Sequence, residues 1–354
     1  MLTIHGTLQL IFVINLLSTF DTNLLVRCIS NVCVISKTIT EIAVILVVTE
    51  KLHSIYEQLQ KIGGLNKEEY NFELRILLGA DLVHLAVAFV AGISHLCKGL
   101  QSPERYYEYS LLSLSIQNKV LSSVCSNLYL STIGFLTYSA TVLVLIYAHL
   151  MKFIEIHLKV LASHLKALRS NINGLDENSL IENSEYQNEV FEILKNHIVC
   201  HSLLRACAKN FNSTIFIPWM ISFYLGMLYL IGMLFSFFSL KTVVYDAGDY
   251  SVVATTILAG VMTIFMVIGG GQKVVNASVY VFQTAFDCPW TCWNITNRKF
   301  FQIFLCYLQE PIRLGSGNLV PLEHSFSVKI FNFLLSACRF FDTMSDRRNQ
   351  VKLN

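Results

Sequence analysis

Charged residues and proline are scarce in this sequence. Only 14% of the 354 residues are charged, whereas soluble globular proteins contain about 25%. There are five prolines, 54% of the residues are hydrophobic, and the mean hydropathy is +0.53. Because the hydrophobic residues also gather in long blocks, this composition excludes an ordinary soluble domain and indicates a polytopic membrane protein.

The sequence also lacks the patterns of the common enzyme and metal-protein classes. It has no catalytic Ser-His-Asp spacing and no histidine-rich cluster, and the glycines at 269–271 have no strand before them. Most of the ten cysteines fall inside the hydrophobic blocks or on one expected side of the membrane, which argues against a disulfide framework. We therefore expect no enzyme activity, no catalytic residue, no metal, no cofactor and no nucleic-acid partner.

The hydrophobic blocks are long enough to cross a bilayer as helices, which takes about 20 residues each. No Lys or Arg precedes Arg27, so the first block lacks the basic start of a signal peptide and is expected to be a true span. The sequence thus predicts an all-α membrane protein with seven transmembrane helices. The blocks are 1–20, 24–49, 76–97, 120–151, 211–240, 251–286 and 319–341.

The distribution of basic residues predicts the orientation. With these spans, fifteen Lys and Arg residues fall on the side of the N-terminus, eight on the opposite side and three within spans. Since cytoplasmic loops are richer in basic residues, we expect a cytoplasmic N-terminus and an extracellular C-terminus. This is the reverse of a G-protein-coupled receptor, and the Asp-Arg-Tyr and Asn-Pro-x-x-Tyr motifs of that class are also missing.

Amphipathic helices are expected on the cytoplasmic side. One continues span four beyond Met151, a second precedes span five, and a third covers 298–309, whereas the polar stretch 169–189 is expected to be a loop. We favour packing of these helices on each other or on a neighbouring subunit; the alternative is that they lie on the bilayer surface. The apolar stripes consist of Ile154, Leu158, Leu161, Leu165 and Leu168, then Val190, Leu194 and Ile198.

A joint precedes the last span. Pro311 disfavours a helical conformation at Glu310, and Gly315 and Gly317 add backbone freedom. The span that follows is the least apolar of the seven, and polar groups at membrane depth are costly unless they face protein or water. It is therefore either a pore-lining helix or a central helix whose polar groups are satisfied within one subunit. Its polar residues are Glu323, His324, Ser325, Ser327, Lys329, Asn332, Ser336 and Arg339.

Charged residues also fall inside earlier spans. Lys37 and Glu41 lie four residues apart in span two, and Asp81 lies at comparable depth in span three. Intramembrane charges usually pair, so we expect a structural ion cluster first and part of a hydrated cavity second. His84 and His95 are expected to be hydrogen-bonded helix residues rather than pH sensors.

The carboxyl-terminal region resembles that of the insect odorant receptors. The strings NASVYVFQTAFDCPW, RKFFQIFLCYLQEPIRLGSG and PLEHSF carry the resemblance, together with KNHIVCHSLLRACAKNF, which contains His201, before span five. The inverted seven-span order is similar as well. The matching positions are Ser278, Tyr280, Trp290, Arg298, Lys299, Gln309, Pro311, Gly315 and Phe326.

The resemblance implies a function and a location. It implies a subunit of an odour-gated, non-selective cation channel, a heterotetramer assembled with an obligate co-receptor subunit in the plasma membrane, at the sensory dendrite of an olfactory neuron. A small volatile apolar ligand would bind in the outer half of the subunit, among spans two, three, four and six. The last helix would line the pore, and the cytoplasmic helices would form an anchor domain.

On this basis the chain divides into six parts. Spans one to four occupy 1–151, the cytoplasmic helical extensions and their loop 152–210, and spans five and six 211–286. The anchor helix and hinge occupy 287–317, the pore-lining span seven 318–345, and an extracellular tail 346–354.

Candidate site residues follow from helical spacing on these elements, because a pocket for such a ligand is mostly apolar. Alignments of the last span to the family on Phe326 or on Ser336 differ by three residues, which leaves the gate position open. The candidate ligand contacts are Phe89, Ile93, Tyr129, Ile133, Leu136, Tyr250, Val253 and Ile257. The candidate hinge and pore residues are Pro311, Gly315, Gly317, Ser336, Arg339 and Phe340.

Other classes remain as alternatives. The insect gustatory receptors share the architecture, but their pattern of Thr-Tyr, five apolar residues and Gln-Phe in the last span is not present here. A G-protein-coupled receptor is disfavoured by the orientation. A small-molecule transporter is disfavoured because the sequence shows neither internal repeats nor paired broken helices.

Overall fold

The computed structural model of the chain describes residues 67–101, 119–170, 177–239, 247–316 and 320–353, together with short stretches between 33 and 57. The described residues are almost all helical, which confirms the predicted all-α class. The elements are α3 (Lys67–Gln101), α5 (Lys119–Ser170), α6 (Glu177–Glu182), α7 (Ser184–Ser239), α8 (Ala247–Phe286), η2 (Trp290–Cys292), α9 (Ile295–Leu308), β1 (Gly315–Ser316), β2 (Val320–Pro321) and α10 (His324–Leu353).

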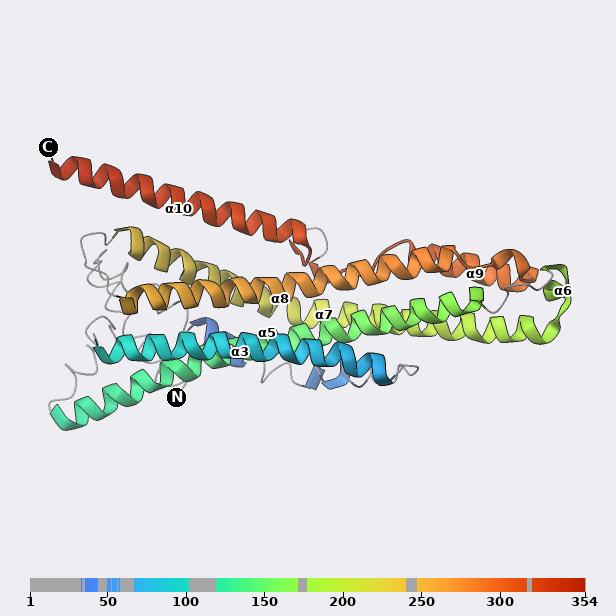
Figure 1. Ribbon diagram of the computed structural model, residues 1–354, viewed down its shortest axis with the longest axis horizontal. Helices are drawn as coiled ribbons and strands as arrows, with labels where there is room; N and C mark the ends of the chain where they lie inside the picture. Colours follow the sequence, from blue (N-terminus) through green and yellow to red (C-terminus); the bar gives the residue numbers. More distant parts are fainter. Residues whose placement is uncertain are drawn as a thin grey trace.

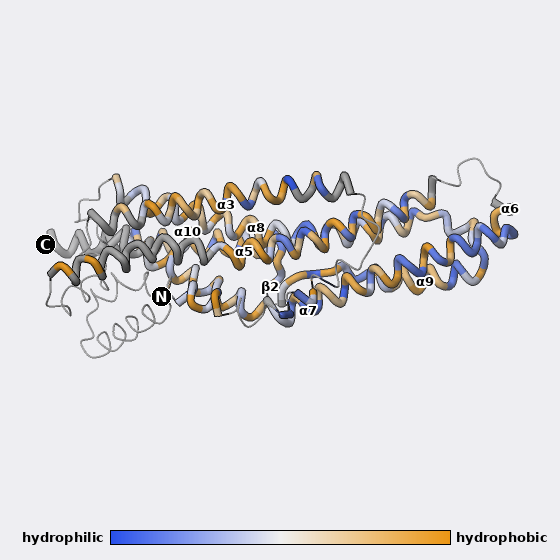
Figure 2. Tube along the Cα trace, turned by 90° about the horizontal axis from the view of Figure 1, so that it is seen from below, coloured by the Kyte–Doolittle hydropathy of each residue, from blue (hydrophilic) through white to orange (hydrophobic). Residues whose placement is uncertain are grey.

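Helices α3, α5, α7 and α8 run side by side along the molecule (Figure 1). Helices α3, α5 and α8 contact one another, and α7 contacts α5 and α8. At one end of this bundle lie α6, η2 and α9, whereas α10 diverges from it and has its main contacts with α7 and α8. Hydrophobic residues dominate the half of the bundle opposite α6 and α9, and hydrophilic residues alternate with them in the other half (Figure 2).

The longest helices are much longer than a bilayer is thick. Helix α5 has 52 residues and α7 has 56. At a rise of 1.5 Å per residue each is about 80 Å long, against roughly 30 Å for a hydrocarbon core. Each therefore holds a segment that can cross a membrane and a second that extends beyond it. The helix expected to continue past Met151 is confirmed.

Helix α7 is bent where its two segments join. The parts Ser184–Thr214 and Phe216–Gly232 differ in direction by 48°. Pro218 lies inside the helix. Proline has no backbone N–H, so the carbonyl of Thr214, four residues earlier, loses its helical partner and the ring crowds it. The bend thus follows from one residue in the sequence.

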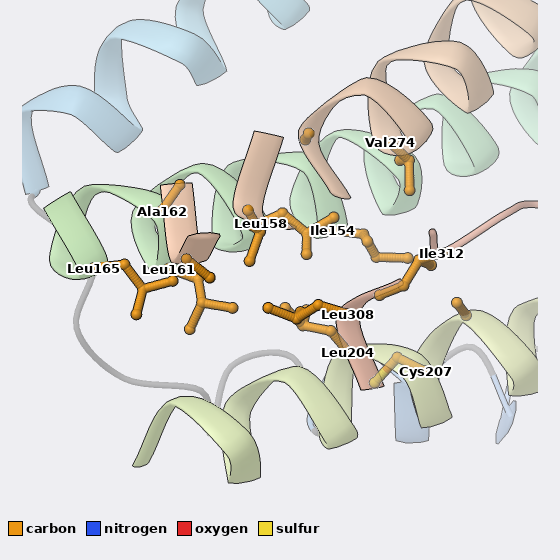
Figure 3. Close-up of a cluster of buried hydrophobic side chains, with 14 of the residues drawn as sticks. Ile154, Leu158, Leu161, Ala162, Leu165, Leu204, Cys207, Val274, Leu308 and Ile312 are labelled. Carbon is orange, nitrogen blue, oxygen red and sulfur yellow. The ribbon is translucent and has the colours of Figure 1, made fainter. Parts of the chain in front are cut away.

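The second segments pack together in a unit that we call the anchor bundle. It comprises residues 152–170 of α5, α6, residues 184–210 of α7, residues 274–286 of α8, η2 and α9. The predicted stripe of α5 is buried against α7 and the chain around the end of α9 (Figure 3). This confirms packing of the amphipathic helices on each other, because a stripe lying on a bilayer surface would be exposed in the single chain. The facing residues are Leu204, Cys207, Leu308 and Ile312.

The sequence predicted that the stretch 169–189 is a loop. This is wrong in part, because α6 and the start of α7 fall within it. The Asn183 side chain accepts hydrogen bonds from two backbone N–H groups of the first turn of α7, both at 3.1 Å. Gln187 is buried; it donates to the carbonyl of Cys292 at 3.0 Å and accepts from the N–H of Asn294 at 2.9 Å. Asparagine and glutamine suggested a loop by composition. Here Asn183 caps α7, and Gln187 connects α7 to the segment before α9.

Several described helices are long and apolar enough to cross a membrane. These are Arg75–Ser94, Thr141–Leu168 and Tyr250–Phe286, with the bent α7 as a fourth. Span one lies outside the described residues, and of span two only 33 and 36–43 are described. The expected seven spans and their orientation therefore stay predictions. Helix α10 continues to Leu353, through most of the expected tail.

The stability of the anchor bundle can be tested at Leu158, whose side chain is fully buried. Leu158→Ala removes its contacts and leaves a cavity, so we expect a loss of about 2–5 kcal/mol in unfolding free energy. The measurement is thermal unfolding of the purified full-length chain. Val199→Ala on the exposed face of α7 is the control and should change stability by less than about 0.5 kcal/mol. Equal effects of the two substitutions would contradict a dry core at Leu158.

Candidate functional site

Buried polar groups link helices within the apolar half of the bundle. Lys37 Nζ lies 2.7 Å from Glu41 Oε1, and the Ser222 hydroxyl of α7 donates to the same carboxylate oxygen. Glu41 is only 1% exposed, so most of this ion pair is shielded from solvent. The predicted pairing of Lys37 with Glu41 is confirmed. The sequence did not name Ser222, which joins the described helical stretch 36–43 to α7.

A second pair joins α3 to α5. Asp81 Oδ2 lies 2.5 Å from His149 Nε2. The sequence predicted one ion cluster of Lys37, Glu41 and Asp81, and His149 is a partner of Asp81 that the sequence did not name. The reason is packing: α3 lies against α5, so the two side chains meet across that contact.

His84 provides a third polar link, between α3 and α8. Its Nδ1 lies 2.9 Å from the sulfur of Met266, and its Nε2 lies 3.3 Å from the hydroxyl of Thr263. Both partners are on α8, so the expectation of a hydrogen-bonded helix residue is confirmed. The side chain of His95 lies outside the described residues.

The helices that carry the candidate ligand contacts are neighbours. The hydroxyls of Ser94 on α3 and Ser251 on α8 lie 3.3 Å apart, and α5 contacts both helices. The candidate residues therefore lie on adjacent helices at one end of the bundle. Phe89, Ile93, Tyr250 and Ile257 are exposed on the single chain, Val253 is half-buried, and the side chains of Tyr129, Ile133 and Leu136 are outside the described part.

The predicted joint between α9 and α10 is present and has a defined structure. Helix α9 ends at Leu308, and an antiparallel pair of two-residue strands, β1 and β2, precedes α10. Gly315 has φ +120°, and a Cβ there would lie 2.3 Å from the carbonyl oxygen of Val320. Glycine is required at this position, because other residues rarely adopt that conformation. Gly317 lies outside the described residues.

Arg205 of α7 holds the end of α9 before the joint. Its Nη2 donates to the carbonyl of Glu310 at 2.5 Å and to that of Tyr307 at 3.3 Å, and its guanidinium lies 4.9 Å from the centre of the Tyr307 ring. These carbonyls lie where the helix ends, and a cation is favourable at a helix C-terminus. Beside it, burial lowers the pKa of His201 to about 4, with Arg205 acting in the same direction. His201 is therefore neutral near pH 7 and packs as an aromatic ring against Phe304.

Helix α10 is largely exposed on the single chain. Ser336, Arg339 and Phe340 all lie on exposed positions, and the Ser336 hydroxyl bonds to the carbonyl of Asn332 in its own helix. Near its start, Phe326 packs against Phe223 of α7 with ring centroids 5.8 Å apart. The helix is thus held at its base and presents both polar and apolar side chains beyond it.

The structure also identifies site residues that the sequence did not. Ser222 and His149 carried one usable signal: each is a polar residue inside an apolar block, and a polar group at membrane depth needs a partner. The partner could not be named, because that depends on which helices are adjacent.

A helical bundle with several apolar segments of membrane-crossing length is the architecture of a helical membrane protein. A family model described as 7tm Odorant receptor matches residues 25–334. The chain therefore belongs to this family of odorant receptors, as its carboxyl-terminal motifs suggested. The comparison with curated proteins gives no match.

Two solved structures of the insect olfactory receptor OR5 from Machilis hrabei have a similar fold. The complex with eugenol matches with a TM-score of 0.70 at 11% identity, over 97% of this chain and 87% of that one. A second structure of OR5 matches with a TM-score of 0.68 at 13% identity, over 99% of this chain and 87% of that one. At these identities the likeness is one of fold.

The buried ion pair in the apolar half can be tested by Glu41→Gln. The substitution removes the negative charge beside Lys37, so we expect a loss of about 2 kcal/mol or more in unfolding free energy. Glu57→Gln is the matched control, because Glu57 and His53 form an exposed pair four residues apart. It should change stability by less than about 1 kcal/mol. Equal unfolding midpoints for the two variants would show that the Glu41 pair is not desolvated.

Proposed function

We propose that the chain is a subunit of an odour-gated, non-selective cation channel that assembles as a heterotetramer with the co-receptor of its family. In this proposal α10 lines the pore, the anchor bundle holds the subunits together, and the volatile ligand binds among span two, α3, α5 and α8. The N-terminus is cytoplasmic and the C-terminus extracellular, and the protein acts at the plasma membrane of the olfactory dendrite.

The observation that carries this proposal is the separation of α10 from the bundle. The helix bears Lys329, Asn332, Ser336 and Arg339, yet it leaves most of its surface without contacts in the single chain. A helix with this composition is not stable against lipid on all sides, so it needs other protein or water around it. A pore shared between subunits provides both.

The position of the ligand is supported by the arrangement of α3, α5 and α8. These helices contact one another, and the candidate contacts lie at the end away from the anchor bundle. The residues named there are mostly apolar, as a site for a volatile ligand requires. The similar OR5 structure holds eugenol, so eugenol is a reasonable first compound for a test panel.

Currents test this function. We expect the chain, co-expressed with the co-receptor, to give inward currents within milliseconds of applying a panel of volatile phenols, alcohols and esters that includes eugenol, with no nucleotide or G protein supplied. The co-receptor expressed alone is the control. An epitope fused after Asn354 should also be stained on unpermeabilised cells. Responses that require a G protein, or staining only after detergent, would contradict the proposal.

Assembly is supported by apolar side chains on the outside of the anchor bundle. Ile295 and Ile303 of α9 are 71% and 67% exposed, and Tyr307 lies half-exposed one turn further on. Phe286 at the end of α8 is similarly exposed. Exposed apolar patches on a bundle of this kind mark protein contacts.

The assembly surface can be tested by Ile303→Asp. A carboxylate in a desolvated contact is costly, so we expect the amount of complex with the co-receptor to fall at least tenfold. The amount of complex is measured by co-purification and by native mass spectrometry. Gln302→Asp introduces the same charge at the adjacent exposed position of α9 and is the control. If both variants assemble like the original chain, this face of α9 is not part of the subunit contact.

A further inference from the structure

The segment between α9 and α10 is attached to the rest of the subunit by side chains of α7 and α8. Asn212 of α7 donates through Nδ2 to the carbonyl of Arg313 at 3.1 Å, and its Oδ1 accepts from the N–H of Gly315 at 2.9 Å. One amide group thus bonds to two backbone groups on either side of residue 314, and holds the chain just before and within β1.

Two residues of α8 also form hydrogen bonds with this segment. The buried Ser278 hydroxyl accepts from the N–H of Ile312 at 3.0 Å. Gln272 Oε1 accepts a hydrogen bond from the N–H of His324 at 3.1 Å. His324 is the first residue of α10. The N–H groups at the start of a helix have no partner within it, so Gln272 connects α8 directly to the base of the proposed pore helix.

The backbones of α8 and the hinge also meet without side chains between them. A Cβ on Gly271 would lie 2.3 Å from the carbonyl oxygen of Leu322 and 2.5 Å from its Cβ. Only glycine allows so close an approach. The contact lies one residue before Gln272, so the close approach and the hydrogen bond to His324 fix the same point of α8.

We propose that Asn212, Ser278 and Gln272 form a hinge lock, a set of positioning residues that makes α10 move with α7 and α8. The lock bonds the backbone at Ile312, Arg313, Gly315 and His324 to α7 and α8, so a displacement of α8 is passed to the base of α10. This inference rests on the proposed channel function, in which α8 contacts the ligand and α10 lines the pore.

The first arm of the test needs no ligand. Hydrogen exchange of the hinge is measured on the purified full-length complex with the co-receptor, in Asn212→Leu and Ser278→Ala. Each substitution removes the partner of a backbone N–H, at Gly315 or Ile312, so exchange in the 310–324 peptide should be about three- to tenfold faster. Asn210→Leu and Ser213→Ala are the controls, because both residues are exposed and the Ser213 hydroxyl donates to the carbonyl of Asn210 in its own helix.

The second arm measures currents with the same panel, eugenol included, divided by the number of channels at the cell surface. The maximal evoked current per channel should fall at least threefold in the two lock variants and stay unchanged in the controls. Asn212→Asp keeps an acceptor for Gly315 but not the donor to Arg313, so its current and exchange should lie between those of Asn212→Leu and the original chain.

The two arms separate the possible failures. Exchange that is unchanged in both lock variants would overturn the lock whatever the currents do. Faster exchange with unchanged currents would show that the segment is held but does not transmit movement, which also overturns the proposal. Absence of any odour-evoked current in the original chain would overturn the channel function, and the transmission role with it, while the exchange result would still show whether Asn212 and Ser278 restrain the hinge.

Discussion

The dry packing of the anchor bundle is the interaction on which the rest of this structure depends. Its core joins α5, α7, α8 and α9, which are separated in the sequence by loops and by whole membrane-length segments. Each buried leucine contributes about 1.5–3 kcal/mol of hydrophobic free energy, and the stripe of α5 alone holds several. Because the bundle is held in this way, α9 can end in a fixed position and the chain can leave it as an irregular segment.

The apolar half of the molecule is organised by a different force. There the hydrophobic effect does not select one helix neighbour over another, since lipid is as apolar as a leucine side chain. Specific polar links take over this role: Glu41 with Ser222, Asp81 with His149, and His84 with Thr263. Each link joins two different helices, and each would leave a buried polar group unsatisfied if the helices separated. The two halves therefore keep their helices together for different physical reasons.

The sequence predicted most of the local structure, because local structure depends on patterns along the chain. The leucine stripe after Met151, the helix at 298–309 and the joint at Pro311 and Gly315 are all present. It failed where the answer depended on spatial neighbours. The partner of Asp81 on α5, His149, could not be named from the sequence. The polar stretch 169–189 was assigned to a loop, because the hydrogen bonds of Gln187 to the segment before α9 cannot be read from composition. For the candidate ligand contacts, the structure establishes adjacent helices, and helical spacing remains the basis for choosing the individual residues.

The segment between α9 and α10 combines a fixed base with a helix that is exposed beyond it. A helix that contacts the bundle only near its start can change its tilt while breaking few contacts, provided that its base does not unravel. The base here is held by hydrogen bonds between its backbone N–H groups and the side chains of Asn212, Ser278 and Gln272, whereas side chains beyond Phe326 are largely exposed in the single chain. Because hydrogen bonds are directional, they fix the orientation of the base as well as its position. A rotation of α8 by a few degrees at Gln272 would then change the direction of α10. Because α10 is long, this change in direction would give a larger displacement at its C-terminal end.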